Sequence, residues 1–376
     1  MDPRRQSHAL LRPDAIGRPA REGSRSEARR VSRPRIAVIG AGHLGSIHAR
    51  LLAERTDVRL AGVVDPSPEA RRKLIEKLDV STLSSVEELS DDVEAAIVAT
   101  PTTSHCKVAL ALLERGVHIF VEKPIAARSV EARALCRAAR RHDRILQVGH
   151  SERFNGAWLA AYPFLRDCRH IRASRTSGFP SRSLDVGVVL DLMIHEIDLI
   201  LSLTDAPVVD LSAHAAVVVG PHEDVVSARI EFADGLVVEL ESSRVSPWRR
   251  RRWEVLTHEG LVEIDFAQPA VSTALAEPSF GAVARQVAHW PYRRRQEFAE
   301  QLFRRWMPHR QLPVVPVNAI EREHDEFLAA IRGDGSVTVD GEAACRAVEL
   351  AERIVAACGE PMRLDGGTAT PEKEAA

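Results

Sequence analysis

The chain has 376 residues, of which 45% are hydrophobic, so it is long enough to form two domains with separate cores. Its 51 lysine and arginine residues nearly balance 53 aspartate and glutamate residues, and the formal net charge is -2. This balance argues against a nucleic-acid-binding protein, which would carry a strong basic field. No apolar run approaches the ~20 residues of a membrane-spanning helix, so we expect no integral membrane segment.

The two ends of the chain predict disordered tails, over residues 1–33 and 361–376. Residues 1–33 are rich in Arg, Ser and Pro without hydrophobic periodicity, which indicates a tail or a misassigned start. Arg29 and Arg30 suggest a twin-arginine export signal, but the apolar segment of about 7 to 15 residues that it needs is missing. The five cysteines are scattered without a C-x-x-C pair, which favours free thiols, no structural zinc and a cytoplasmic location.

Residues 34–150 alternate short apolar strands with helical stretches, the pattern of a parallel sheet covered on both faces. We expect strands over residues 35–39, 59–64, 95–99, 118–121 and 145–148. Helices are expected between them, at about residues 46–54, 68–78, 103–115 and 129–140. This order predicts a doubly wound α/β domain of the Rossmann type.

The first predicted strand runs into a glycine-rich turn, Gly40-Ala41-Gly42-His43-Leu44-Gly45, where a helix begins. Such a turn lets the backbone approach a pyrophosphate at the helix N-terminus. Asp65 ends the second predicted strand, 20 positions after Gly45, where a carboxylate can bind the adenosine ribose. A carboxylate there repels a 2′-phosphate, so we expect NAD rather than NADP, although Arg71 and Arg72 follow closely and can compensate for its charge.

The predicted helix over residues 191–203 carries a narrow polar stripe on an otherwise apolar surface. At 100° per residue, Asp191, His195 and Asp198 fall within about 60° of one another. Buried carboxylates and imidazoles are costly unless they are paired. The stripe therefore predicts either a substrate site, with a lysine and a substrate hydroxyl as partners, or a structural network in which Asp198 anchors His195.

Four motifs resemble the glucose-fructose oxidoreductase and inositol dehydrogenase family: Gly40-x-Gly42-x-x-Gly45, Ala99-Thr100-Pro101, Glu122-Lys123-Pro124 and Asp191-x-x-x-His195. The resemblance covers about residues 34–358 and implies a Rossmann domain followed by an open, mainly antiparallel sheet whose face covers the nicotinamide. It implies that Lys123 lies beside the nicotinamide and the reacting hydroxyl, and that Asp191 and His195 approach from the second domain. The cofactor-binding residues that it implies are Gly40, Gly42, His43, Leu44, Gly45, Asp65, Thr100, Pro101, His105, Glu122 and Lys123.

The expected chemistry is the oxidation of a secondary alcohol, in which one group takes the hydroxyl proton while hydride leaves for the nicotinamide. Histidine titrates nearest to neutral pH, so His195 is the expected base. Lys123 would stabilise the developing alkoxide, and Asp191 would orient the substrate and keep the lysine charged. No metal is implied.

Residues 151–360 predict an α+β domain with an open, mainly antiparallel sheet. We expect strands over residues 171–175, 208–219, 225–232, 236–243, 253–257 and 260–265, and helices near 320–332 and 341–358. Hairpin turns at residues 233–235 and 258–260 make the flanking strands antiparallel neighbours. The four arginines at 249–252 are expected in a hairpin loop, at a solvated edge rather than at a phosphate.

Residues 149–155 and 185–192 resemble the branch of the family that oxidises the 3-hydroxyl of UDP-N-acetylglucosamine. A basic stretch nearby would suit a diphosphate, although each arginine is alternatively a surface residue. The substrate residues expected on this basis are Arg153, Asn155, Arg175, Arg182, Asp191 and His195, with Arg172 nearby. The alternatives are a dehydrogenase of a free polyol or of another sugar nucleotide, and an NAD-binding regulator without catalysis.

Residues 293–307 predict a basic amphipathic helix, with Phe298, Leu302, Phe303 and Trp306 on one face among five arginines. Such a helix suits weak peripheral contact with an anionic membrane surface. The alternative is a helix that packs on its own domain or on a partner subunit. We also expect the chain to form a homo-oligomer.

Overall fold

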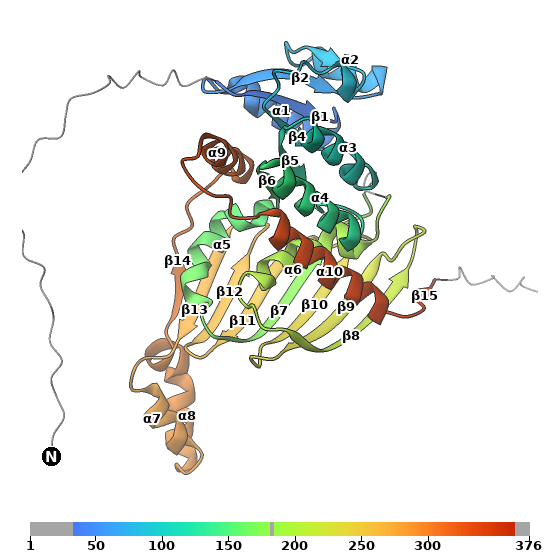
Figure 1. The fold of residues 1–376 in the computed structure, drawn as a ribbon. Helices are drawn as coiled ribbons and strands as arrows, with labels where there is room; N and C mark the ends of the chain where they lie inside the picture. Colours follow the sequence, from blue (N-terminus) through green and yellow to red (C-terminus); the bar gives the residue numbers. More distant parts are fainter. Residues whose placement is uncertain (1–32, 181–183, 365–376) are drawn as a thin grey trace, which may run out of the picture. The chain divides into compact units, whose positions relative to one another are not determined.

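The computed structural model describes residues 33–180 and 184–364, which form two β-sheets with their associated helices (Figure 1). Residues 1–32, Arg182 and most of the predicted C-terminal tail lie outside the described residues. Within the described part of the chain, no helix is both long enough and apolar enough to cross a membrane.

Sheet A contains six parallel strands in the order β3-β2-β1-β4-β5-β6. Its strands are β1 (Arg35–Ile39), β2 (Arg59–Val64), β3 (Thr82–Leu83), β4 (Ala95–Val98), β5 (His118–Glu122) and β6 (Leu146–Gly149). Its helices are α1 (His43–Glu54), α2 (Pro68–Ile75), α3 (Thr102–Glu114) and α4 (Ser129–His142). The predicted doubly wound fold is confirmed, and the order reverses between β1 and β4, where such sheets bind their ligands.

The central residues of the long strands of sheet A are mostly apolar because both faces of the sheet are buried. Alternate side chains supply two separate cores. In β1, Ile36 and Val38 pack in the same core as Leu52 of α1, whereas Ala37 and Ile39 pack in the core that contains Leu112 of α3. This arrangement fixes the carboxyl ends of β1, β4 and β5, from which the candidate site residues project.

Sheet B contains nine strands in the order β14-β13-β12-β11-β7-β10-β9-β8-β15. Its strands are β7 (Cys168–Thr176), β8 (Val208–Val217), β9 (Val225–Phe232), β10 (Val237–Ser243), β11 (Arg250–Thr257), β12 (Gly260–Asp265), β13 (Ala270–Leu275), β14 (His309–Leu312) and β15 (Met362–Arg363). The predicted hairpins β9–β10 and β11–β12 are antiparallel, as expected. The pairs β7–β10 and β8–β15 are parallel, so the sheet is mixed.

Helices cover one face of sheet B (Figure 1). They include α5 (Gly156–Ala161), α6 (Ile194–Leu201) and α10 (Gly341–Ala357), while α9 (Ala319–Arg332) packs back on sheet A. Along β11, Trp253 and Val255 are buried on the covered face, whereas Glu254 and Leu256 are exposed on the other. The loop predicted for residues 249–252 is wrong from Arg250 onward, because β11 begins there and its alternation turns Arg251 toward the covered face.

The predicted basic helix forms part of an arm inserted between β13 and β14, made of α7 (Phe280–Val287), α8 (Tyr292–Gln301) and the π-helical turn η5 (Leu302–Trp306). The ring of Phe298 packs against the rings of Phe280, Trp290 and Trp306, with centroids 6.4, 5.8 and 6.0 Å away. Phe298 therefore packs within the arm, whereas Phe303 is exposed.

Candidate active site

The glycine-rich turn between β1 and α1 has the shape of a pyrophosphate site. Gly40 has a φ of +108°, and a Cβ atom there would lie 2.5 Å from the Ala99 carbonyl oxygen. A Cβ on Gly45 would lie 1.9 Å from the Gly40 carbonyl oxygen, whereas one on Gly42 would meet no atom within 4 Å. No side chain caps α1, whose first turn holds His43, Leu44 and Gly45. Open space thus precedes a helix N-terminus with free amides, which fits a dinucleotide pyrophosphate.

Asp65 follows β2 and is hydrogen-bonded to this turn. Its Oδ2 accepts from the Ala41 amide and its Oδ1 from the Ser67 amide, both at 2.8 Å. A carboxylate has about four lone-pair sites, so two ribose hydroxyls can still be bound. Arg71 donates to the Asp65 carbonyl oxygen at 2.5 Å. After β2 the chain therefore carries the Asp65 carboxylate, which would repel a 2′-phosphate, and the Arg71 guanidinium, which would attract it.

His105 connects the loops that follow β4 and β5. Its Nδ1 lies 2.8 Å from the Pro124 carbonyl oxygen and its Nε2 lies 2.9 Å from the Thr100 carbonyl oxygen. Burial lowers the pKa of His105, so it is neutral at neutral pH. The imidazole thereby holds the loop at Thr100 next to the segment that carries Lys123.

Glu122 ends β5 and faces the interior. Its Oε1 lies 2.8 Å from His48 Nε2, and His48 Nδ1 lies 2.8 Å from His324 Nε2 on α9. Burial alone would raise the pKa of Glu122, but the hydrogen bond from His48 and the charge of Lys123 bring it below its ordinary value. Glu122 Oε2 also accepts from the Lys123 amide at 3.2 Å. Glu122 thus anchors the backbone that presents Lys123.

Lys123 links the two sheets. Its Nζ donates to the Asp191 carbonyl oxygen at 2.7 Å and lies 3.6 Å from Asp191 Oδ1. Burial lowers the pKa of Lys123, and the charges of Asp191 and Glu122 offset part of that change. An ammonium group has three donors, and the bond to the Asp191 carbonyl uses one of them, so Lys123 can still donate to another oxygen.

Asp191 lies in the π-helical turn η4 (Val189–Met193), directly before α6. The prediction of a continuous α-helix from Asp191 is therefore wrong in its first turn. A π-turn contains more residues than an α-turn, and such turns frequently occur at functional sites. Here the wider turn brings the Asp191 carbonyl oxygen and carboxylate together at Lys123.

His195 is a half-buried imidazole without a hydrogen-bond partner among the residues that the structure describes. Its buried Nδ1 is one of the unpartnered atoms. Burial, and then the charges of Lys123 and Arg175, lower the pKa of His195 well below its ordinary value. The ring is consequently neutral at neutral pH and able to accept a proton.

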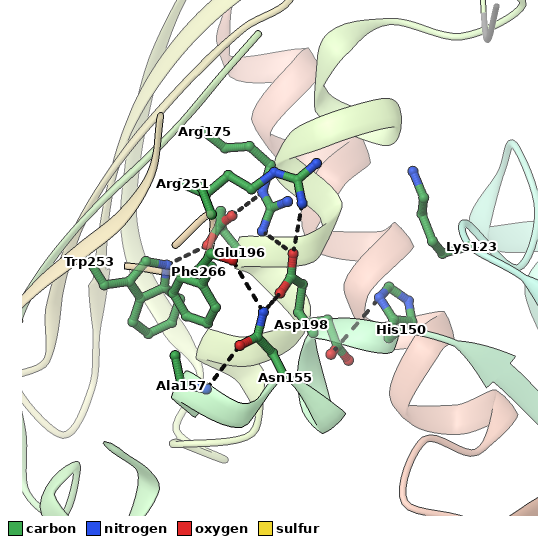
Figure 2. Close-up of polar contacts among 12 residues, drawn as sticks. Lys123, His150, Asn155, Ala157, Arg175, Glu196, Asp198, Arg251, Trp253 and Phe266 are labelled. Atoms are coloured by element: carbon green, nitrogen blue, oxygen red, sulfur yellow. Dashed lines mark hydrogen bonds and ion pairs between the residues drawn. The ribbon is translucent and has the colours of Figure 1, made fainter. Parts of the chain in front are cut away.

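The structural interpretation of the polar stripe predicted that Asp198 anchors His195, but it does not. Its carboxylate instead receives two hydrogen bonds from Arg153, at 2.6 and 3.0 Å. His150 Nδ1 lies 3.9 Å from Asp198 Oδ2 (Figure 2). The His150 ring meets the His195 ring edge to face, with ring centroids 6.5 Å apart. A second buried imidazole therefore stands behind His195.

Arg175 lies in a buried polar network beneath α6 (Figure 2). Its guanidinium group bonds Glu196 and also Glu152, the latter at 2.9 Å. The Trp253 indole donates to the same Glu196, and Asn155 donates to Glu152 at 2.8 Å. Arg153, Asn155 and Arg175 thus already have protein carboxylates as partners.

Sequence reasoning missed several members of this site: His48, His150, Glu152, Glu196, Arg251 and Trp253. Glu196 adjoins the predicted His195, yet its position on the helix gave no sign that it is buried. His150 was noticed only as part of a family motif. The other missed residues could have been noticed only as charged, imidazole or indole side chains in largely apolar segments. Such a side chain indicates a site only when its partner is known.

Two family models match the chain. Residues 34–150 match the GFO/IDH/MocA oxidoreductase family, NAD-binding Rossmann fold, and residues 162–263 match the GFO/IDH/MocA C-terminal domain. A UDP-N-acetylglucosamine 3-dehydrogenase of Acidithiobacillus ferrooxidans is 35% identical over 237 residues, which cover 62% of this chain and 74% of that protein. A scyllo-inositol 2-dehydrogenase (NAD(+)) of Bacillus subtilis is 30% identical over 250 residues, covering 61% of this chain and 73% of that protein.

Solved structures agree with this match. The A. ferrooxidans UDP-N-acetylglucosamine 3-dehydrogenase superposes with a TM-score of 0.74 at 29% identity, covering 86% of this chain and 97% of that one. A dehydrogenase of Chromobacterium violaceum in complex with NADH and UDP-GlcNAcA gives a TM-score of 0.66 at 18% identity, covering 87% and 94%. The second likeness supports the fold alone.

Proposed function

Because the chain belongs to the GFO/IDH/MocA family of oxidoreductases, we propose that it oxidises the 3-hydroxyl of UDP-N-acetylglucosamine to a 3-keto sugar nucleotide with NAD. The observation that carries the proposal is the meeting of Lys123, Asp191 and His195 at the carboxyl end of β5. Of the two relatives described above, one is named for a sugar nucleotide and the other for an inositol. The sugar-nucleotide enzyme has the higher identity, 35%, and this favours a sugar nucleotide as the substrate.

The proposed mechanism assigns a separate task to each of the three side chains. The nicotinamide, when bound, supplies the acceptor for the hydride that leaves the substrate carbon. His195, neutral because of its lowered pKa, takes the proton from the 3-hydroxyl. Lys123 donates a hydrogen bond to the same oxygen and stabilises the alkoxide charge, while Asp191 keeps the ammonium in place.

The proposal is tested by following NADH absorbance with UDP-N-acetylglucosamine, free N-acetylglucosamine and myo-inositol. The 3-keto product is unstable, so hydroxylamine or an aminotransferase is included as a trap. We expect NADH formation with the sugar nucleotide. Turnover of inositol alone would replace the substrate assignment and leave the mechanism standing, whereas NAD binding without turnover of any sugar would indicate a regulator.

We infer a preference for NAD over NADP from the Asp65 carboxylate, since it would lie against a 2′-phosphate. Arg71 opposes this preference through its contact with the Asp65 carbonyl. Asp65→Ala is expected to bring the dissociation constants of NAD and NADP closer together. Arg71→Ala is expected to move them further apart. Titration of both cofactors against the wild type and both variants checks this, and equal wild-type affinities would contradict the preference.

We also propose a homo-oligomer in the cytoplasm. The face of sheet B away from the helices exposes Leu256 and Leu261, which supports contact with another subunit. All five cysteines are free thiols, which suits a reducing compartment. Light scattering of the full chain after gel filtration gives the number of subunits.

A further inference from the structure

Arg251 lies on the covered face of sheet B, beside the candidate site. It is two residues from the buried Trp253 along β11, so both side chains lie on the same face, and it stands opposite Arg175 in the register of β7. Figure 2 shows the Arg175 and Arg251 side chains side by side. Arg175 in turn bonds Glu196, which follows His195 in the sequence.

The Arg251 guanidinium has an incomplete set of protein partners. Like charges directly opposite one another destabilise a sheet. Arg175 is already paired with Glu196 and Glu152, and Arg251 reaches only Glu152, at 3.6 Å. Within residues 33–180 and 184–364, no side chain accepts a hydrogen bond from the Arg251 guanidinium, and 35% of this side chain is exposed. Departures from local rules of this kind are expected where a ligand supplies the missing partner.

Trp248 lies in the loop that leads into β11. Its carbonyl oxygen accepts hydrogen bonds from Thr176 Oγ1 at 2.6 Å and from Ser246 Oγ at 3.0 Å, so its backbone is fixed at the end of β7. The residue is nevertheless 67% exposed. A flat aromatic ring on a fixed backbone therefore stands at most about 10 Å along the chain from the Arg251 backbone.

We propose that Trp248 and Arg251 form the nucleotide subsite, in which the indole stacks on the base and the guanidinium binds the diphosphate. The inference rests on the proposed function, because it identifies what distinguishes a sugar nucleotide from a free polyol at that same site. Arginine binds phosphate oxygens through two parallel hydrogen bonds, and aromatic rings stack on bases. Arg251 thereby becomes a specificity-determining residue of the reaction.

The test uses the NAD-bound full chain and UDP itself as the probe, measured by calorimetry. Arg251→Gln is expected to weaken UDP binding about 10-fold or more, and Trp248→Ala about 5-fold or more. Arg252→Gln is the matched control, because Arg252 is exposed on the other face of β11 and pairs with Glu263. It should bind UDP as the wild type does. Thermal melting verifies that each variant is folded, and Arg251→Lys should recover part of the affinity.

Two outcomes overturn the subsite: wild-type chain that does not bind UDP, and an Arg251→Gln variant that binds UDP as tightly as the wild type. Turnover separates the subsite from the proposed function. If UDP-N-acetylglucosamine is oxidised and Arg251→Gln leaves its KM unchanged, the function stands and the subsite falls. If UDP binds through Arg251 but UDP-N-acetylglucosamine is not oxidised, the subsite stands and the assigned reaction falls.

Discussion

His195 owes its proposed role to its surroundings. An ordinary histidine titrates near pH 6.5 and would be partly protonated in the cell. Here burial and the neighbouring cations Lys123 and Arg175 penalise the imidazolium form. In the proposed reaction the same cations would stabilise the alkoxide. One electrostatic arrangement would thus keep the base neutral and also stabilise the negative charge that forms when the base takes the proton.

Replacing His195 with asparagine is expected to lower kcat about 100-fold or more, the usual scale for a positioned acid or base, while NAD affinity stays near normal. In the wild type, kcat/KM should hold steady as the pH falls to about 6.5 and decline only below it, as the pH passes through the lowered pKa of His195. Steady-state rates over a pH series check both expectations. Wild-type turnover in the variant would remove His195 from the mechanism.

The sequence motifs pointed to Lys123, Asp191 and His195, and the structure brings Lys123 and Asp191 into contact. The catalytic roles of the three residues stay predictions. The sequence was not sufficient for Glu196 or Arg251. Glu196 is buried because Arg175 and Trp253, on two different strands, both bond its carboxylate. Arg251 was expected in a solvated loop, and only the start of β11 at Arg250 reveals the face on which it lies. Both depend on long-range pairing of strands, which local pattern does not encode.

Two predicted α-helices differ from the prediction, because each contains a π-helical turn at one end. The helix at Asp191 begins as a π-turn, and the basic helix of the arm ends in another. In sheet B, the alternation of apolar residues and the turn residues were enough to predict the two hairpins, which have the expected antiparallel pairing. One carboxylate, Asp224, organises the adjoining β8–β9 connection.

Asp224→Asn is expected to cost about 3–5 kcal/mol of unfolding free energy, because it leaves Arg244 buried beside a neutral amide. Asp224 accepts hydrogen bonds from Val218, Val219 and Gly220 amides and from Arg244, and these outweigh burial to lower its pKa to about 2. Its stabilisation is therefore complete above the unfolded-state pKa and is lost as the pH falls toward 2. Denaturant titration at neutral pH measures the cost.

Asp265→Asn is the control for Asp224→Asn. Asp265 also accepts backbone hydrogen bonds, from Ala267 and Gln268, but in an exposed turn. Its replacement should cost less than about 1 kcal/mol. Equal losses in the two variants would show that the buried pair with Arg244 adds nothing.

The arm is not expected to hold the protein on a membrane. Peripheral helices insert a free apolar face, whereas Phe298 is surrounded by the aromatic rings of Phe280, Trp290 and Trp306. Vesicles of anionic lipid sedimented at low salt should leave the protein in the supernatant. Retention that disappears in Arg294→Glu and Arg305→Glu variants would instead support the peripheral contact.

Across the whole chain, the last two helices join the two sheets. Phe327 and Leu328 of α9 belong to the core beneath sheet A, and α10 packs between α4 and α6. The sequence predicted both helices and left open whether they pack on the second sheet or on the first domain, since an apolar stripe does not specify what covers it. The joining also buries Glu323, whose two carboxylate oxygens have no hydrogen-bond partner among the described residues.

Glu323→Gln is expected to raise the melting temperature by about 2 °C or more at about pH 8, and to change it little near pH 5. Burial, and then the charge of Glu122, raise the pKa of Glu323 well above its ordinary value. A raised folded-state pKa stabilises the fold fully below the unfolded-state pKa, and this stabilisation is lost as the pH rises toward the folded value. Glutamine has no proton to release. Glu321→Gln, on the exposed side of α9, is the control, and a variant that melts below the wild type at both pH values would contradict the expectation.

The bond from Lys123 to the Asp191 carbonyl has an evolutionary consequence. The ammonium has a structural task besides its proposed catalytic one, because it joins the end of β5 to η4 whether or not a reaction takes place. His195 makes no such bond among the described residues. A descendant that abandoned catalysis would therefore be free to lose the histidine but would still be selected to keep the lysine. In genomes, the histidine is then the mark of a working enzyme, and the lysine alone marks only an intact fold.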